Sequence, residues 1–216
     1  MSIIALAQPA DAEVVYKPAH VTLTYTHSYS LDLNGDGVAD FVLRDGLFGF
    51  DTGFVIKLNI LAQVAGNVAM AYTTDDGLDF ASALKSGAQI GPVTGKASPY
   101  LAAFYSDFSG RGSLGPWANV KNCYLGLRFQ INGKPHFGWA RLSVLVNQHN
   151  IDAYLTGYAY ETIPGKGIVA GQTTGTADDA KLNPQPSNED QPASLGKLAL
   201  GAAKPGAVQI PTEKAE

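Results

Sequence analysis

Residues 124–146 read YLGLRFQINGKPHFGWARLSVLV, two apolar runs that meet at Asn132-Gly133. Both turn residues tolerate positive φ, so this dipeptide favours a two-residue turn between the strands of a β-hairpin. The predicted strands cover residues 124–131 and 134–146. The hairpin is the clearest structural signal in the chain, and it indicates an antiparallel β protein.

The turn also fixes which residues lie opposite each other across the hairpin. One face of the hairpin is apolar and is predicted to belong to the core. Its expected cross-strand pairs are Leu125 with Ala140, Leu127 with Gly138 and Phe129 with His136, and Leu142 and Val144 extend it.

The opposite face of the hairpin is aromatic and basic, with Tyr124, Arg128, Phe137, Trp139 and Arg141. Trp139 is expected opposite Gly126, where an aromatic ring covers bare backbone, and Arg beside aromatic rings favours cation–π contacts. One interpretation is that another sheet or the segment 91–122 covers this face. The other is a shallow platform that stacks sugar rings or binds a partner, with Trp117 on a Gly-rich loop as a further member.

The rest of the chain before residue 173 is predicted to be mostly strands. Alternating or continuous apolar runs predict them at residues 21–26, 39–43, 54–62, 68–72, 100–105, 151–161 and 167–170. Residues 79–85 are the best helix candidate, because Asp79 is a good N-cap and Gly87 a good stop. Residues 13–172 are therefore expected to form one antiparallel β-sandwich or jelly-roll-like domain with one short helix.

Composition excludes several classes of function. Charged residues make up 16% of the chain and the net charge is −4, without a Lys/Arg cluster, so nucleic-acid binding has no electrostatic footprint. No apolar run reaches about 18 residues, the length from which a membrane-spanning helix is predicted. The single cysteine, Cys123, permits no internal disulfide.

The stretch DLNGDGVAD at residues 32–40, called the acidic loop below, fits the pattern D-x-N-x-D-G-x-x-D. Calcium takes six to eight hard oxygen ligands, and residues at alternate positions converge on one point when a glycine permits a sharp turn. The loop therefore predicts a calcium site. Its expected ligands are the side chains of Asp32, Asn34, Asp36 and Asp40 and the backbone carbonyl of Val38.

The acidic loop departs from an EF-hand at one position. An EF-hand has a bidentate Glu at position twelve, where this chain has Leu43. Strand-like flanks at residues 29–31 and 41–43 predict that the loop joins two strands, so that calcium would hold a hairpin together and Asp45 or another segment would complete its shell. The alternative is an Asp/Gly turn that binds no metal.

No catalytic signature stands out, and no enzymatic activity is expected. Residues 110–115 formally match G-x-G-x-x-G, but they follow no clear strand and run into Pro116-Trp117 instead of a helix. Glycoside hydrolysis needs two carboxylates that flank a cleft. Asp152 and Glu161 are candidates for such a pair, and nothing in the sequence places them together.

The two ends of the chain differ in character from its body. Residues 1–12 end in Ala-x-Ala, the small-residue pattern that signal peptidase cuts after, so they are predicted to be the remnant of a signal peptide. Residues 173–216 begin with a polar, Pro-bearing stretch that buries little apolar surface. They are predicted to be a disordered tail.

The segments YLGLRF, NG, HFGWAR, AYET and IVAG follow one another between residues 124 and 171. This order resembles the body of uncharacterised exported bacterial proteins that commonly end in a PEP-CTERM sorting signal. Residues 191–202 resemble the start of such a signal. Because Lys197 interrupts this segment and no terminal Arg cluster follows, we expect a degenerate anchor.

The resemblance implies a role at the cell surface or in the extracellular matrix. We therefore expect a secreted, periplasmic or cell-surface protein with a structural calcium loop. Its expected partners are polysaccharide or other surface components. The first alternative is a carbohydrate-binding module that uses the aromatic face, and the second is an uncharacterised hydrolase.

Overall fold

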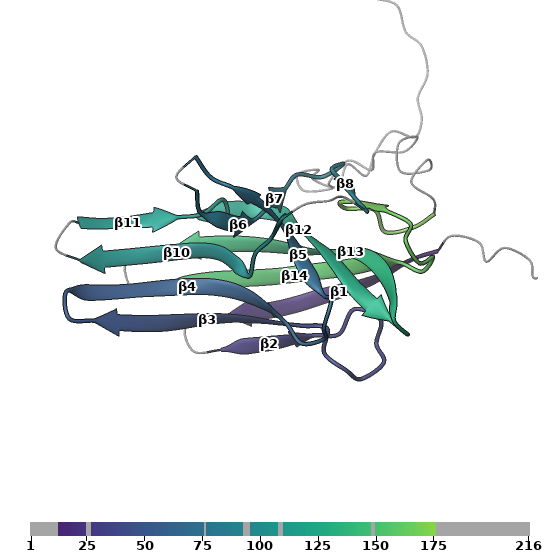
Figure 1. Ribbon diagram of the computed structural model, residues 1–216, viewed down its shortest axis with the longest axis horizontal. Helices are drawn as coiled ribbons and strands as arrows, with labels where there is room; N and C mark the ends of the chain where they lie inside the picture. The colour runs from purple at the N-terminus through teal and green to yellow at the C-terminus, as the bar shows by residue number, and fades with distance from the viewer. Residues whose placement is uncertain are drawn as a thin grey trace, which may run out of the picture. The chain divides into compact units, whose positions relative to one another are not determined.

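The computed structural model describes residues 13–24, 27–75, 77–92, 96–107, 110–147 and 150–175. The chain divides into two compact units, Met1–Pro184 and Gln185–Glu216, and all described residues belong to the first. The predicted signal-peptide remnant and most of the predicted disordered tail lie outside the described residues. Every regular element in the described part is a strand (Figure 1), and no helix there is long and apolar enough to cross a membrane.

The larger of two main sheets has eight strands. Its order is β1-β14-β13-β12-β5-β6, with β7 also paired to β12 and β9 to β5, and all of these pairs are antiparallel. The strands are β1 (Val14–Leu23), β5 (Val68–Thr73), β6 (Asp79–Ala81), β7 (Ala83–Leu84), β9 (Lys96–Ala97), β12 (Val120–Ile131), β13 (Lys134–Val146) and β14 (Ile151–Glu161).

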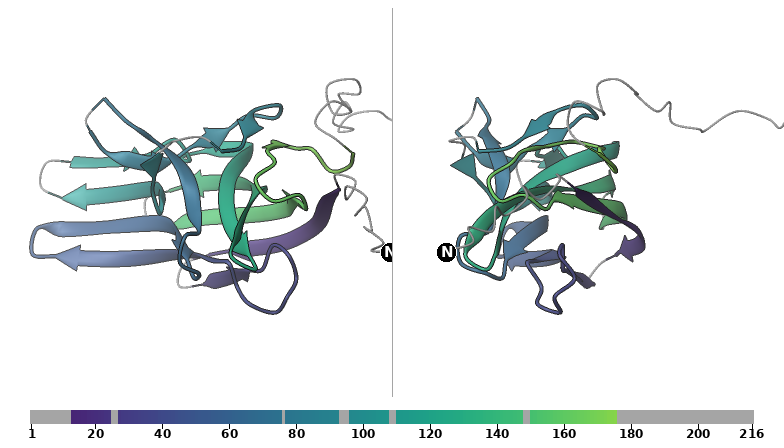
Figure 2. Two further views of the ribbon diagram at one scale, coloured as in Figure 1. Left: turned by 45° about the vertical axis from the view of Figure 1, so that its right-hand side comes forward. Right: turned by 90° about the vertical axis from the view of Figure 1, so that its right-hand side faces the viewer.

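The smaller main sheet has five antiparallel strands in the order β11-β10-β4-β3-β2 (Figures 1 and 2). They are β2 (Ser28–Leu31), β3 (Phe41–Phe50), β4 (Gly53–Ala62), β10 (Tyr100–Asp107) and β11 (Gly110–Leu114). A separate two-stranded pair joins β8 (Gln89–Ile90) to β15 (Ile168–Val169). The fold is all-β, and its two antiparallel sheets are consistent with a β-sandwich.

Both main sheets contribute to one hydrophobic core. Leu43, Ile56 and Leu58 from the smaller sheet and Leu125, Leu127, Phe129 and Leu142 from the larger sheet belong to the same buried cluster. Burying each such side chain contributes about 1.5–3 kcal/mol. Because side chains alternate along a strand, this core uses one face of each sheet and leaves the other face for other contacts.

The central hairpin has the predicted register. Leu125 lies opposite Ala140, Leu127 opposite Gly138 and Phe129 opposite His136. Asn132 and Gly133 have φ values of 51° and 74°, as a primed two-residue turn requires. The predicted core face is confirmed, since the apolar residues of these pairs are buried.

The predicted helix at residues 79–85 is wrong, because this segment forms strands β6 and β7. Ala81 pairs with Ala71 of β5, and Leu84 pairs with Tyr124 of β12. A two-turn helix gains little without tertiary packing. The backbone groups of this segment bond to neighbouring strands instead.

Several strands are longer than expected or additional, and β1 and β11 are two of them. β1 begins at Val14 and continues past Pro18, where its pairing with β14 shifts register. Residues 110–114, which are not among the predicted strands, form the edge strand β11. Neither strand shows clear apolar alternation, because β1 contains Lys17-Pro18 and β11 begins with Gly-Arg-Gly.

Candidate functional site

The acidic loop joins β2 to β3. Leu31 lies opposite Phe41 at its two ends, so the predicted arrangement of strand, loop and strand is confirmed. Leu33 is fully buried in the core and anchors the loop from within. Figure 2 shows that the backbone of the loop projects outward from the sheets.

The carboxylate of Asp32 is held by the backbone of its own loop. The amide of Gly35 donates to Oδ1 at 2.6 Å, and the amide of Gly37 donates to Oδ2 at 2.9 Å. Gly35 and Gly37 have φ values of 79° and 89°, in the left-handed region that glycine adopts at little cost. The two glycines thus let the chain wrap around the first acidic side chain.

Asn34 and Asp36 form a second set of contacts on the exposed side of the loop. Asn34 Nδ2 donates to Asp36 Oδ2 at 2.8 Å, and the amide of Val38 donates to Asp36 Oδ1 at 2.8 Å. These hydrogen bonds, that from Asn34 first, lower the pKa of Asp36 below its ordinary value of 3.8. Asp36 is therefore ionised at neutral pH.

Asp40 faces the interior. Its Oδ2 accepts a hydrogen bond from the buried amide of Leu33 at 2.9 Å, and its carbonyl accepts one from Asn67 Nδ2 at 3.1 Å. Burial raises the pKa of Asp40, and the negative charges of Asp32 and Asp36 raise it further, against the lowering effect of the Leu33 amide. The charges of Asp32 and Asp36 thus both act on Asp40.

Lys17 of β1 provides a positive charge beside the loop. A Cβ atom built on Gly35 would lie 2.6 Å from Lys17 Nζ, and this ammonium group also lies 5.8 Å from the centre of the Tyr158 ring. Burial is the main cause that raises the pKa of Tyr158 to about 12, and Tyr29 and the charge of Asp32 add to it.

The donor set of the loop suits calcium, although its carboxylates are not gathered around one point. The loop offers hard oxygens from Asp32, Asn34, Asp36 and Asp40, the kind that calcium prefers. Among the described residues, however, no three His, Cys, Asp or Glu side chains form a group that could hold a metal ion. Asp45, predicted as a further ligand, is buried in β3 outside the loop. Calcium binding would therefore require the carboxylates to exchange hydrogen bonds within the loop for the ion.

Asp40→Asn is expected to change how stability depends on pH. Because the folded chain holds the Asp40 proton more tightly than the unfolded chain, this group lowers the free energy of unfolding as pH rises from 3.8 to its raised pKa. The substituted amide keeps an oxygen for the Leu33 amide but does not titrate. Urea unfolding of both proteins in EDTA, from about pH 3 to pH 7, should show a smaller decline for the variant. A constant difference between them would contradict a raised pKa.

The predicted aromatic surface is mostly a second core. Tyr124, Phe137 and Trp139 are 7%, 3% and 1% exposed, and they pack with residues of β8 and β15. Trp139 Nε1 donates to the carbonyl of Gln172 at 3.1 Å. An open platform for sugar rings is therefore contradicted at these three residues. Their cover is the separate two-stranded sheet β8–β15, so the expectation that another sheet covers this face is borne out, and residues 91–122 are not the cover.

The other three predicted surface residues are engaged elsewhere. Trp117 is fully buried in the first core, and its Nε1 donates to the carbonyl of Ala81 at 2.9 Å. Arg141 Nε donates to Thr156 Oγ1 at 2.7 Å, and Arg128 reaches the carbonyl of Gly66 at 3.4 Å. The six residues thus form no single surface.

Asp152 and Glu161 do not form a catalytic pair. They lie nine residues apart on the single strand β14, a separation of about 30 Å, whereas carboxylates that act on one glycosidic bond lie about 5–9.5 Å apart. Glu161 is also buried and forms an ion pair with Lys166 at 3.3 Å. This pair therefore gives no support to a glycosidase.

The sequence interpretation overlooked one open feature, a groove beside β10 with exposed aromatic residues near it. The spacing of Phe48 and Phe50 on β3 placed both rings on one face of a strand, and this signal was available from the sequence. No family model, curated protein or solved structure matches this chain, so its function has to be inferred from the acidic loop, the second core and this groove.

Proposed function

We propose that this protein is a non-enzymatic protein of the cell surface or extracellular matrix, with a β-sandwich or jelly-roll-like domain. In this proposal the acidic loop binds one calcium ion as a structural staple. The observation that carries it is the sharp turn of the acidic loop, with positive φ at Gly35 and Gly37, between the paired strands β2 and β3.

This turn matters because it brings the oxygen-bearing side chains of the loop around its own backbone. A calcium loop needs its first, third and fifth residues on one side of a sharp turn. Asp32, Asn34 and Asp36 have that spacing, and positive φ at Gly37 supports the turn after them. Burial is the main cause of the raised pKa of Asp40, and a bound divalent cation would offset the smaller contribution from the charges of Asp32 and Asp36.

Calcium would act here by holding a short edge strand in place. β2 has four residues and is the last strand of its sheet, so few contacts restrain it. The acidic loop connects β2 to the long strand β3. Extracellular calcium modules bind with dissociation constants of about 10⁻⁴–10⁻³ M, and such affinity would suffice outside the cell.

The proposed location rests on the sequence. The Ala-x-Ala pattern at the N-terminus and the resemblance to exported PEP-CTERM-type proteins both favour export. Calcium at millimolar concentration is a feature of the exterior, so a weak structural site and an exported protein fit together.

The calcium proposal predicts a higher melting temperature in calcium than in EDTA. At about one hundred times the dissociation constant, one bound ion adds about 2.7 kcal/mol to the free energy of unfolding, which raises the melting temperature by about 5–10 °C for a domain of this size. Calorimetric titration of the full chain should show one site. Asp36→Ala should abolish both the heat of binding and the rise in melting temperature.

Two further variants make this experiment specific. Asp51→Ala removes an exposed acid from the turn between β3 and β4 and should leave calcium binding unchanged. Lys17→Met removes the positive charge beside Gly35 and should raise the calcium affinity. If no heat is released and the melts in calcium and EDTA coincide, the acidic loop is a tight turn without a metal.

A further inference from the structure

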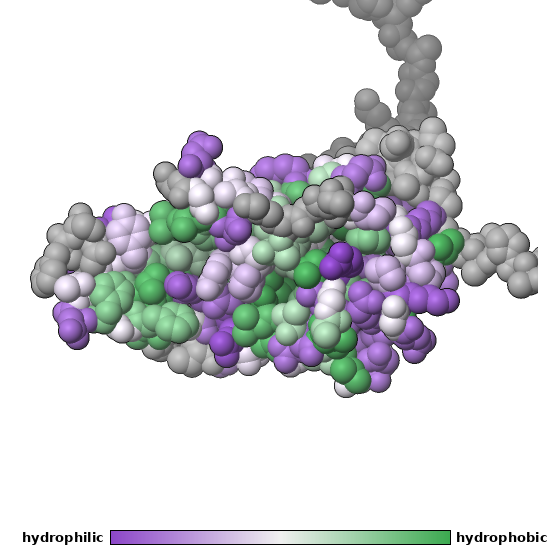
Figure 3. Space-filling model, viewed as in Figure 1, coloured by the Kyte–Doolittle hydropathy of each residue, from purple (hydrophilic) through white to green (hydrophobic). Residues whose placement is uncertain are grey.

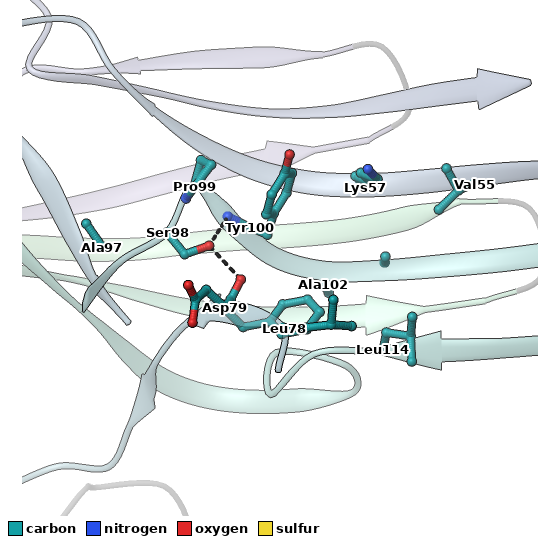
Figure 4. A pocket seen from close by; sticks show the side chains of 12 residues that line it. Val55, Lys57, Leu78, Asp79, Ala97, Ser98, Pro99, Tyr100, Ala102 and Leu114 are labelled. Atoms are coloured by element: carbon teal, nitrogen blue, oxygen red, sulfur yellow. Dashed lines mark hydrogen bonds between the residues drawn. The ribbon is translucent and has the colours of Figure 1, made fainter. Parts of the chain in front are cut away.

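A groove of about 450 Å³ runs beside β10 (Figure 4). Ala102 lines it from β10, between Val55 and Lys57 of β4 on one side and Leu78 and Leu114 on the other. Pockets for small molecules typically measure about 300–1,000 Å³ and are lined mainly by apolar side chains. This groove matches that description in both size and lining.

The edges of the groove expose large apolar side chains. Leu78, Tyr100 and Leu114 are 48%, 42% and 42% exposed, and Phe48 on the neighbouring strand β3 is 50% exposed. Figure 3 shows hydrophobic residues gathered over β3, β4 and β10 on this face. Contiguous exposed apolar surface of this kind marks binding sites more often than single exposed residues do.

Lys57 places one positive charge at this apolar surface. Its Nζ lies 5.3 Å from the centre of the Phe48 ring and 5.0 Å from that of the Tyr100 ring. No carboxylate in the described part of the chain forms an ion pair with it. The two rings hold the ammonium group by cation–π attraction, in a position where an anionic ligand would meet it.

The polar groups at the end of the groove already have partners. Ser98 Oγ donates to the carbonyl of Asp79 at 2.7 Å and accepts from the amide of Tyr100 at 3.1 Å. Asp79 Oδ1 accepts from the hydroxyl of Thr73 at 2.6 Å. A sugar would bury several hydroxyl groups here with few partners, and each unpartnered hydroxyl costs free energy. An apolar ligand with one charged group fits the groove better.

We propose that the groove binds a small amphiphilic carboxylate. Its apolar body lies over Ala103, which pairs with Lys57 of β4 and Leu114 of β11, and its carboxylate lies at Lys57 Nζ. The site shares no residue with the acidic loop, so it does not depend on calcium. The protein thus has a second role in this proposal, the binding of small amphiphilic carboxylates, in addition to its structural role.

The test uses octanoate and octan-1-ol, which share a chain length and differ in charge. Isothermal titration of the full chain in EDTA should show that octanoate binds about tenfold more tightly, the size of effect expected for one charge-assisted contact. Lys57→Met keeps the apolar stem and should abolish this difference, whereas Lys57→Arg should retain it. Lys134→Met, at the exposed hairpin turn, is the matched control and should behave like the natural protein.

A second measurement locates the ligand. Octanoate should shift the amide NMR signals of Ala102 and Ala103 and leave those of the acidic loop unchanged, and Ala103→Leu should weaken binding by filling the groove. Equal affinity for octanoate and octanol, or unchanged preference in Lys57→Met, would overturn the proposal. So would binding of a neutral hexasaccharide at these alanines without binding of octanoate. Because all titrations contain EDTA, failure of the calcium proposal would not affect the result.

Discussion

Replacing Trp139 with alanine is expected to lower the free energy of unfolding by about 3–5 kcal/mol. The side chain is 1% exposed, and its ring lies 5.8 Å from that of Tyr16 and 5.1 Å from that of Tyr124. Its Nε1 also donates to Gln172. Truncation would leave a large cavity under the β8–β15 pair and an unsatisfied carbonyl at its edge.

Urea unfolding of Trp139→Ala and Trp139→Phe measures this effect. The phenylalanine variant should recover most of the packing and lose about 1–3 kcal/mol, because the carbonyl of the buried Gln172 is left without its donor. Tyr154→Ala is the control, because Tyr154 is 41% exposed on β14, and it should change stability by no more than about 0.5 kcal/mol. An open recognition platform would give a different pattern, in which Trp139→Ala costs little stability.

The contrast between the two faces of the central hairpin shows what a sequence can predict. The register followed from Asn132-Gly133 alone, because a two-residue turn is a local device. The alternation then assigned each side chain to a face, and both assignments agree with the structure. Another sheet was one of the two expected covers of the second face, and β15 lies within the predicted strand 167–170. Its partner β8 did not follow from the sequence, because a strand of two residues carries no periodicity and pairs with β15 across a long stretch of chain.

The wrong helix has a related cause. Asp79 and Gly87 are good helix boundaries, and both signals are local. The competing structure depends on strands β5 and β12, which supply hydrogen-bond partners for β6 and β7. Tertiary pairing outweighs the preference of so short a segment.

The acidic loop was predictable in its outline and not in its interior. The spacing of Asp32, Asn34 and Asp36 and the glycine at position 37 predicted a sharp turn between two strands, which the structure has. The inward direction of Asp40 depends on the buried amide of Leu33 and on Asn67 from another segment. That residue therefore stabilises the loop whether or not a metal binds, and its variants must be compared with Asp36→Ala before they are interpreted as loss of calcium.

Trp117→Ala is expected to lower the free energy of unfolding by a similar amount, about 3–5 kcal/mol, because it removes a large side chain from the first core. Trp117 is fully buried, and its Nε1 donates to the carbonyl of Ala81 at 2.9 Å. It follows Gly115, where an added Cβ would lie 2.5 Å from the carbonyl oxygen of Leu101. This tight turn inserts the indole between segments from both main sheets.

Trp117→Phe separates packing from hydrogen bonding at this site. It should lose about 1–3 kcal/mol, because the buried carbonyl of Ala81 is left without its donor. Leu114→Ala, at a side chain that is 42% exposed on β11, is the neighbouring control and should change little. Ala81 is the last residue of β6, and Leu78, which lines the groove, comes directly before this strand. A folded Trp117→Ala protein should therefore also bind octanoate more weakly, while it keeps its calcium affinity. A loss below about 1 kcal/mol would mean that this turn collapses around the cavity and that the indole is not what joins the two sheets.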